Sequence, residues 1–148
     1  MSQGCFYLLP DAAGPGLLEQ LVCRLTTDYY RQGLGVFIHT CDQAQAEALD
    51  ERLWQQPADG FVAHNLQGEG PRQGAPVVIS HQAPHSGRPV LINLAPEAPA
   101  FARRFKQLID FVPSSEEGKQ QARERFKAYR QAGFELTTAP VPPQTQDE

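Results

Sequence analysis

The hydrophobic residues near the start of the chain first run together and then recur at helical spacing. Residues 5–9 are almost all apolar and are followed by Pro10, which predicts a short buried strand. Between Leu17 and Leu25, leucine and valine recur every three to four positions, so this segment predicts a helix. We expect the helix to end at Gly33, because glycine readily adopts the left-handed conformation that terminates helices.

A second strand and a second helix follow in the same order. Residues 36–39 form a continuous apolar run that predicts another buried strand. Asp42 and Gln45 have the spacing of a capping box, in which each side chain satisfies a free backbone N–H, and the helix is expected to reach about Trp54. Strand, helix, strand and helix in succession are typical of a parallel sheet, so the sequence predicts an α/β fold.

The middle of the chain predicts short strands separated by loops rich in glycine and proline. The strand candidates are residues 61–64, 77–80 and 90–94. A helix is expected from Pro99 to Leu108, and residues 109–112 are expected to form a further strand. The sheet should therefore gain its remaining strands after the first two helices.

The last helix has the clearest boundary signals in the sequence. Pro113 ends the preceding strand, and either Ser114 or Ser115 is placed to cap the helix. Glu117 completes a Ser-x-x-Glu capping box, and Gly133 marks the end of the helix.

The chain has the length of one domain, and its end differs in composition. A chain of 148 residues can bury enough apolar surface to fold without metals or disulfides. Residues 134–137 predict an edge strand, whereas residues 139–148 are polar and rich in proline. We therefore expect one α/β domain over residues 1–138 and a flexible C-terminal tail over residues 139–148.

Composition and charge narrow the class of protein. A net charge of −4 argues against direct binding of duplex DNA, which depends on concentrated Lys and Arg. The chain has no apolar run of about 18 residues and no signal-peptide pattern, so we expect a cytoplasmic protein that does not enter a membrane. Cys5, Cys23 and Cys41 lack metal-binding or redox spacing and are expected to be thiols in or near the core.

The sequence gives little support for catalysis or for a cofactor. Residues 11–16, the turn after the first strand, lack both the GxGxxG spacing and a lysine followed by Ser or Thr. Pro71 removes a backbone donor from the glycine-rich segment 68–76. Only His81 and His85 form a close histidine pair, in a predicted loop, and no GxSxG motif occurs. We expect no cofactor, no metal site and no catalytic residues.

Basic residues gather on the last helix. Between residues 119 and 130 the chain has five basic residues and one acidic residue, Glu124. The basic residues are Lys119, Arg123, Arg125, Lys127 and Arg130. Three of the five are spaced four residues apart and share one stripe, with Phe126 beside it. One interpretation is a solvated helix end that complements the helix dipole. The others are a site for an acidic peptide, with Val112 and Phe126 as apolar contacts, or for single-stranded DNA.

The only tryptophan, Trp54, stands at the end of a predicted helix. The residues that follow it, 55–60, are polar or turn-forming, which indicates that the chain leaves the core there. Trp54 therefore either packs in the core or forms with Phe61 an exposed aromatic pair of the kind found in protein–protein hot spots.

Several strings of residues carry a resemblance to a known family. They are CFYLLP, EQLVC, LWQQPADGFVAHNLQGEGPRQGAPV, DFVP and KQQARERFKAYRQAGFEL. Together they resemble the chi subunit family of bacterial DNA polymerase III, part of the clamp-loader assembly. The resemblance covers most of the chain and includes both the basic helix and the aromatic pair.

This resemblance implies a non-enzymatic replication adaptor with a Rossmann-like three-layer fold, a mainly parallel sheet and no nucleotide site. The adaptor would bind the psi subunit through Trp54 and Phe61, and in some relatives an XPD-like repair helicase would use the same surface. It would also bind the acidic C-terminal tail of single-stranded DNA-binding protein, which ends Asp-Phe-Pro-Phe. The matching positions for the tail are Val112, Lys119, Arg123, Phe126 and Lys127. DNA would be reached only indirectly.

The chain also departs from the family pattern. Phe126 stands where relatives carry Tyr, so a hydroxyl contact is lost while the apolar wall remains. Residues 80–90 and the tail after Thr138 differ from the relatives and are assigned no function. The alternatives are a nucleotide-binding or hydrolytic α/β enzyme whose site assembles only in three dimensions, and a direct single-stranded DNA binder.

Overall fold

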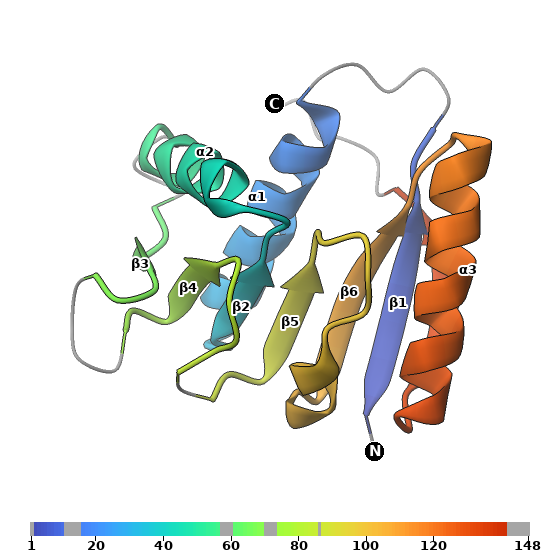
Figure 1. Cartoon of the computed structure of the whole chain (residues 1–148). Coiled ribbons are helices and arrows are strands. Elements are labelled where there is room, and N and C mark those ends of the chain that lie inside the picture. The colour runs from blue at the N-terminus through green and yellow to red at the C-terminus, as the bar shows by residue number, and fades with distance from the viewer. Residues whose placement is uncertain (1, 11–15, 57–60, 70–73, 86, 142–148) are drawn as a thin grey trace.

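A seven-stranded parallel sheet forms the centre of the molecule (Figure 1). The computed structural model describes residues 2–10, 16–56, 61–69, 74–85 and 87–141. Within these residues the strand order is β3-β4-β2-β5-β6-β1-β7, and every neighbouring pair is parallel. The predicted α/β class and mainly parallel sheet are confirmed.

The strands and helices have the following bounds. The strands are β1 (Gln3–Leu8), β2 (Val36–His39), β3 (His64–Leu66), β4 (Val77–Ser80), β5 (Val90–Asn93), β6 (Gln107–Val112) and β7 (Glu135–Pro140). The helices are α1 (Leu17–Arg31), α2 (Gln43–Trp54) and α3 (Glu116–Gln131), with a short 3-10 helix η2 (Ala100–Arg104).

Side chains of successive strand residues point to opposite faces of the sheet and fill two separate cores. Val36 and Ile38 pack in the cluster that includes α1 and α2, whereas Phe37, between them, packs in the cluster that includes α3 and η2. The helices accordingly cover both faces, α1 and α2 on one and α3 on the other (Figure 1). This arrangement is the three-layer sandwich expected for a parallel sheet.

Capping interactions fix where α2 and α3 begin. The Asp42 side chain accepts a hydrogen bond from the Gln45 backbone N–H at 2.8 Å, as the capping box predicts. The Gln45 side chain reaches the backbone N–H of Cys41, one residue before the expected Asp42. Of the two predicted caps for α3, Ser115 is confirmed as the N-cap and accepts from the N–H of Gly118 at 3.0 Å; the Ser-x-x-Glu box of Ser114 and Glu117 is therefore wrong.

The segment before β6 differs most from the prediction. A helix from Pro99 to Leu108 was expected, but only the five residues of η2 are helical. Gln107 and Leu108 instead begin β6, where they pair with both β1 and β5. Leu108 is buried by this pairing, so sheet hydrogen bonding and burial outweigh the helical spacing of the segment.

Four other strands have shifted bounds. The strand expected at residues 5–9 runs from Gln3 to Leu8, and the one expected at residues 90–94 ends at Asn93. The strand expected at residues 61–64 begins at His64 and extends to Leu66. The edge strand expected at residues 134–137 runs from Glu135 to Pro140 and pairs with β1 along its length. Val141 packs against the core, so ordered packing continues three residues past Thr138. Residues 142–148 of the expected tail lie outside the described residues.

Candidate protein-binding surfaces

The inner side of α3 is fixed to the sheet by a buried ion pair. Arg125 donates from Nε to both carboxylate oxygens of Asp110 on β6, at 3.2 and 3.1 Å. Its other two nitrogens donate to the carbonyls of Pro96 and Phe111. Arg125 is 5% exposed, so this member of the five basic residues on the last helix faces the core and adds no charge to the outer surface.

Further donors complete the hydrogen bonding of the same carboxylate. Tyr129 Oη donates to Asp110 Oδ2 at 2.8 Å, and Asn93 Nδ2 donates to the same oxygen at 3.2 Å. Burial raises the pKa of the Tyr129 phenol, because a phenolate would lie in the core beside this carboxylate. We call Asp110, Arg125, Tyr129 and Asn93 the Asp110 network. It joins the end of β5 and the interior of β6 to the second half of α3.

The outer side of α3 carries the predicted basic stripe. We define the basic face as Lys119, Arg123 and Lys127. Lys119 and Lys127 each lie near a glutamate three residues away, at 3.8 and 3.9 Å, and Arg123 donates to Gln120 at 3.1 Å. Exposed pairs of this kind contribute about 0–1 kcal/mol. The basic face can therefore exchange them for carboxylates of a partner at low cost.

Apolar residues border the basic face. Phe126 is half-buried, and its ring packs against Phe6 with centroids 5.4 Å apart. Val112, at the end of β6, is also half-buried against the same core cluster. The structure thus places both predicted apolar residues on the α3 side of the sheet, together with the three cations.

Leu8 is a further apolar residue on this side that the sequence analysis did not single out. It is 45% exposed at the end of β1 and is the register partner of Val112. Residues 5–9 were expected to form a buried strand, and the apolar run gave no sign that its end is uncovered. Leu8 extends the apolar border of the basic face beyond Val112.

Trp54 and Phe61 form an exposed aromatic pair at the other side of the molecule. They are 59% and 53% exposed, and their ring centroids lie 6.4 Å apart. The predicted core position of Trp54 is therefore excluded, and the exposed pair is confirmed.

His64, at the start of β3, supports the aromatic pair from beneath. The Trp54 ring packs on the His64 ring at 4.8 Å. His64 is held by the carbonyls of Val62 and Asp50, at 2.7 and 3.1 Å from its two ring nitrogens. The position of the Trp54 ring is therefore fixed by its contact with His64, where α2 meets β3.

The other chemistry considered from the sequence finds little support. The described ranges contain no group of three or more His, Cys, Asp and Glu residues that could hold a metal ion. No helix in the described part of the chain is long and apolar enough to cross a membrane. Cys23 is buried and Cys5 half-buried, but Cys41 is exposed, contrary to its expected place near the core. Residues 11–15 and 70–73, of the two glycine-containing loops, lie outside the described residues.

The fold and its two surfaces define an α/β domain whose exposed side chains suit contacts with other proteins. A family model described as "DNA polymerase III chi subunit, HolC" matches residues 1–137. The chain belongs to this family, as the resemblance in its sequence predicted. It is therefore a bacterial replication subunit, and chi is a non-catalytic accessory subunit of the polymerase.

Individual relatives agree with the family assignment. The DNA polymerase III subunit chi of Escherichia coli (strain K12) is 49% identical over 144 residues, which cover 94% of this chain and 98% of the relative. The subunit of the same name from Haemophilus influenzae is 42% identical, covering 92% and 95%. That from Pseudomonas aeruginosa is 36% identical, covering 96% and 99%. Each alignment includes nearly the whole of both chains.

Proposed function

We propose that this chi subunit is an adaptor that joins two other proteins of the replication machinery. The basic face of α3, with Val112 and Phe126, binds the acidic C-terminal tail of single-stranded DNA-binding protein. The aromatic pair, Trp54 and Phe61, binds the psi subunit. The adaptor works in the cytoplasm, in the replisome at the nucleoid, and reaches DNA through its partner.

The arrangement of α3 is the observation that carries the tail-binding proposal. Three cations with only weak local partners lie on one exposed face, and apolar side chains border it. A peptide that ends Asp-Phe-Pro-Phe needs cations for its carboxylates and apolar contacts for its rings. Because Arg125 is held by Asp110, the backbone of α3 presents these side chains from a fixed position.

The exposure of the aromatic pair supports the second binding surface. Large aromatic side chains contribute disproportionately to protein–protein binding when a partner excludes water from them. Trp54 and Phe61 are more than half exposed and contact each other, so a partner can cover both at once. An XPD-like repair helicase that used the same pair would compete with the psi subunit.

Peptide binding by point variants tests the tail site. Fluorescence anisotropy would follow a labelled acidic peptide ending Asp-Phe-Pro-Phe at two salt concentrations. Arg123→Ala removes charged hydrogen bonds worth about 1.5–3 kcal/mol, so affinity should fall about 10- to 150-fold. Leu8→Ser should weaken binding less, through the apolar border alone. Lys106→Ala, which removes one exposed charge outside α3, is the matched control and should bind normally.

The outcome of this experiment decides the proposal directly. Binding that weakens with salt and is lost in Arg123→Ala supports the tail site, because salt screens exposed charge pairs. Failure of the wild-type protein to bind the peptide at low salt would refute it. Equal loss in the Lys106→Ala control would also refute it, since binding would then depend on overall charge.

The psi surface needs a separate test. Calorimetric titration with psi should show at least about 30-fold weaker binding for Phe61→Ala, the effect of a hot-spot residue worth about 2 kcal/mol. The same variant should bind the acidic peptide as the wild type does. Loss of peptide binding with intact psi binding would show that the two surfaces have been assigned in reverse.

A further inference from the structure

A second group of basic residues lies outside α3. Between His81 and Ile109 the chain has four of them, Arg88, Arg103, Arg104 and Lys106, and a single acidic residue, Glu97. This contrasts with the net charge of −4 for the whole chain. We define the η2 patch as Arg103, Arg104 and Lys106.

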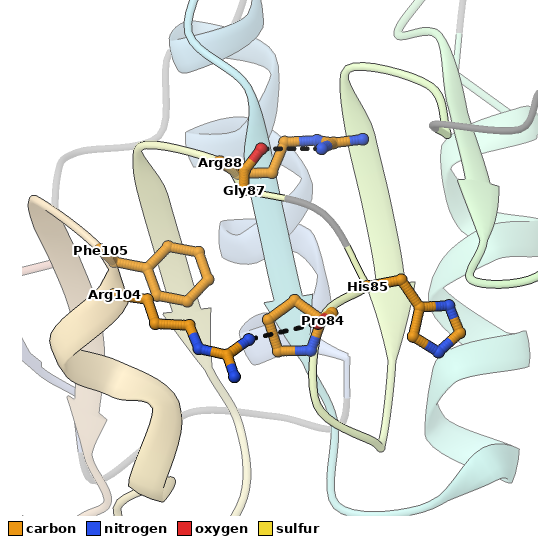
Figure 2. Close-up of a pocket in the computed structure, with 6 residues that line it drawn as sticks. All are labelled: Pro84, His85, Gly87, Arg88, Arg104 and Phe105. Carbon is orange, nitrogen blue, oxygen red and sulfur yellow. Dashed lines mark hydrogen bonds between the residues drawn. The ribbon is translucent and has the colours of Figure 1, made fainter.

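The fold brings this patch against the segment that precedes β5. The backbone N–H of Lys106 donates to the Pro89 carbonyl at 3.1 Å, and Arg104 Nη1 reaches the Pro84 carbonyl at 3.4 Å. Figure 2 shows the Arg104 side chain extending from η2 toward Pro84, with His85 next along the chain. The positive charges are thus gathered where β5 and β6 begin, at the opposite end of these strands from Asn93 and Val112.

The cations of the η2 patch are available to a ligand. Arg103, Arg104 and Lys106 are exposed, and among the residues that the structure describes no carboxylate lies within 4.0 Å of any of them. Arg88 differs, because its guanidinium donates to the carbonyls of Ala75, Pro76 and Gly87. It therefore shapes the neighbouring loop and adds its charge to the local field.

A small pocket beside Arg104 indicates the size of the group that this residue can take. The pocket is open, has a volume of about 120 Å³ and is lined by Pro84, His85, Gly87, Arg88, Arg104 and Phe105; Arg103 and Lys106 of the η2 patch lie outside its lining. This volume is well below the range of about 300–1,000 Å³ that is typical for whole small-molecule ligands. A single anionic group such as a phosphate fits this volume better. One guanidinium can donate two parallel hydrogen bonds to the oxygens of a phosphate.

We infer that the η2 patch binds backbone phosphates of single-stranded DNA, independently of the proposed tail site on α3. The two apolar rings that line the pocket, Phe105 (2% exposed) and Pro84, are buried, so neither offers a broad apolar face to the phenylalanine side chains of an acidic peptide. A phosphate backbone needs only positive charge and hydrogen-bond donors. A single strand is flexible enough to bring successive phosphates to charges at the end of η2 and just before β6. The chi subunit then contacts DNA directly as well as through a partner.

Salt dependence gives a quantitative test. Labelled oligo(dT) would be titrated with the full chain from 50 to 200 mM salt by fluorescence anisotropy. Three phosphate contacts predict a slope of about −2 for log affinity against log salt, or about an 18-fold loss of affinity over this range. Each of Arg103→Ala, Arg104→Ala and Lys106→Ala should reduce the magnitude of the slope by about 0.7.

Parallel titrations with the acidic peptide separate this inference from the proposed function. The triple variant should lose oligo(dT) binding and still bind the peptide, which also shows that it folds. Arg123→Ala should do the reverse. Loss of oligo(dT) binding in Arg123→Ala with full binding in the triple variant would overturn the inference and place the strand on α3.

Three other results would also overturn the inference. They are the absence of oligo(dT) binding by wild type at 50 mM salt, loss of peptide binding in the folded triple variant, and tighter binding of a duplex of the same length. The second result would assign the η2 patch to the peptide, and the third would assign it to the duplex backbone. The first and third results would leave the test of Arg123 with the peptide untouched, so the proposed function could still stand. The second would count against the tail site on α3 as well, and Arg123→Ala would then show whether α3 contributes to peptide binding at all.

Discussion

Removing the carboxylate of Asp110 should be the most damaging single change in this protein outside the purely apolar core. Asp110 is 1% exposed and accepts hydrogen bonds from Arg125, Tyr129 and Asn93. In Asp110→Ala the Arg125 guanidinium keeps its two carbonyl partners but loses its counter-charge while still buried. Breaking a buried ion pair in this way costs about 3–5 kcal/mol.

This cost translates into a large change in a simple measurement. For a domain of about 150 residues, 1 kcal/mol shifts Tm by about 2–4 °C, so Asp110→Ala should lower Tm by about 6–20 °C. Urea unfolding followed by circular dichroism would give the free energy directly. Arg125→Met should be similarly destabilising, because it leaves the carboxylate buried without a cation.

The double variant shows whether the two charges act as a pair. Asp110→Asn combined with Arg125→Met removes both charges and keeps similar side-chain volume. Measured against the single variants Asp110→Asn and Arg125→Met, it should cost less than the sum of these two changes by at least about 1 kcal/mol, as expected for groups in direct contact. The reasoning would be refuted if Asp110→Ala cost less than about 1 kcal/mol, or if the two changes were additive.

Three further changes test other parts of the structure. A methyl group at Gly118 would lie 2.6 Å from Pro113 Cβ, so Gly118→Ala should lower the free energy of unfolding by about 1–3 kcal/mol despite the better helix propensity of alanine. Burial lowers the pKa of His39, so stability should be retained above about pH 6.5 and fall below it. Urea titrations at pH 7.5 and 5.5 should show a smaller fall for His39→Gln. Burial raises the pKa of Cys23 to about 11, so Ellman's reagent should modify exposed Cys41 in the native protein but Cys23 only after unfolding.

Local sequence pattern was sufficient for β2 and β4 and for the existence of α1, α2 and α3. The strands at residues 36–39 and 77–80 have the predicted bounds, because each is a continuous apolar run enclosed by neighbouring strands on both sides. The pattern failed at residues 99–108, where the spacing of apolar residues suits a helix. There the chain forms β6 because its backbone can pair with β1 on one side and β5 on the other. The order of strands in a sheet cannot be read from local sequence.

The site residues show the same limit. Sequence spacing placed Lys119, Arg123 and Lys127 on one exposed face, since helical periodicity alone determines that arrangement. Spacing could not show that Arg125, unlike these three, points inward. Its ion-pair partner, Asp110, is fifteen positions earlier and on a different element. The exposure of Leu8 likewise depends on what covers the end of β1, which is a tertiary property.

The width of the sheet sets how strongly the two proposed protein-binding surfaces can influence each other. Four strand spacings of about 4.8 Å, roughly 19 Å, separate β3, beneath Trp54, from β6, beneath α3, and the helices concerned lie on opposite faces. This exceeds twice the Debye length of about 8 Å at physiological ionic strength. The charge of a ligand bound on α3 is therefore largely screened at the aromatic pair. Binding at one surface should leave affinity at the other unchanged, so the free energies of binding of the two partners should add.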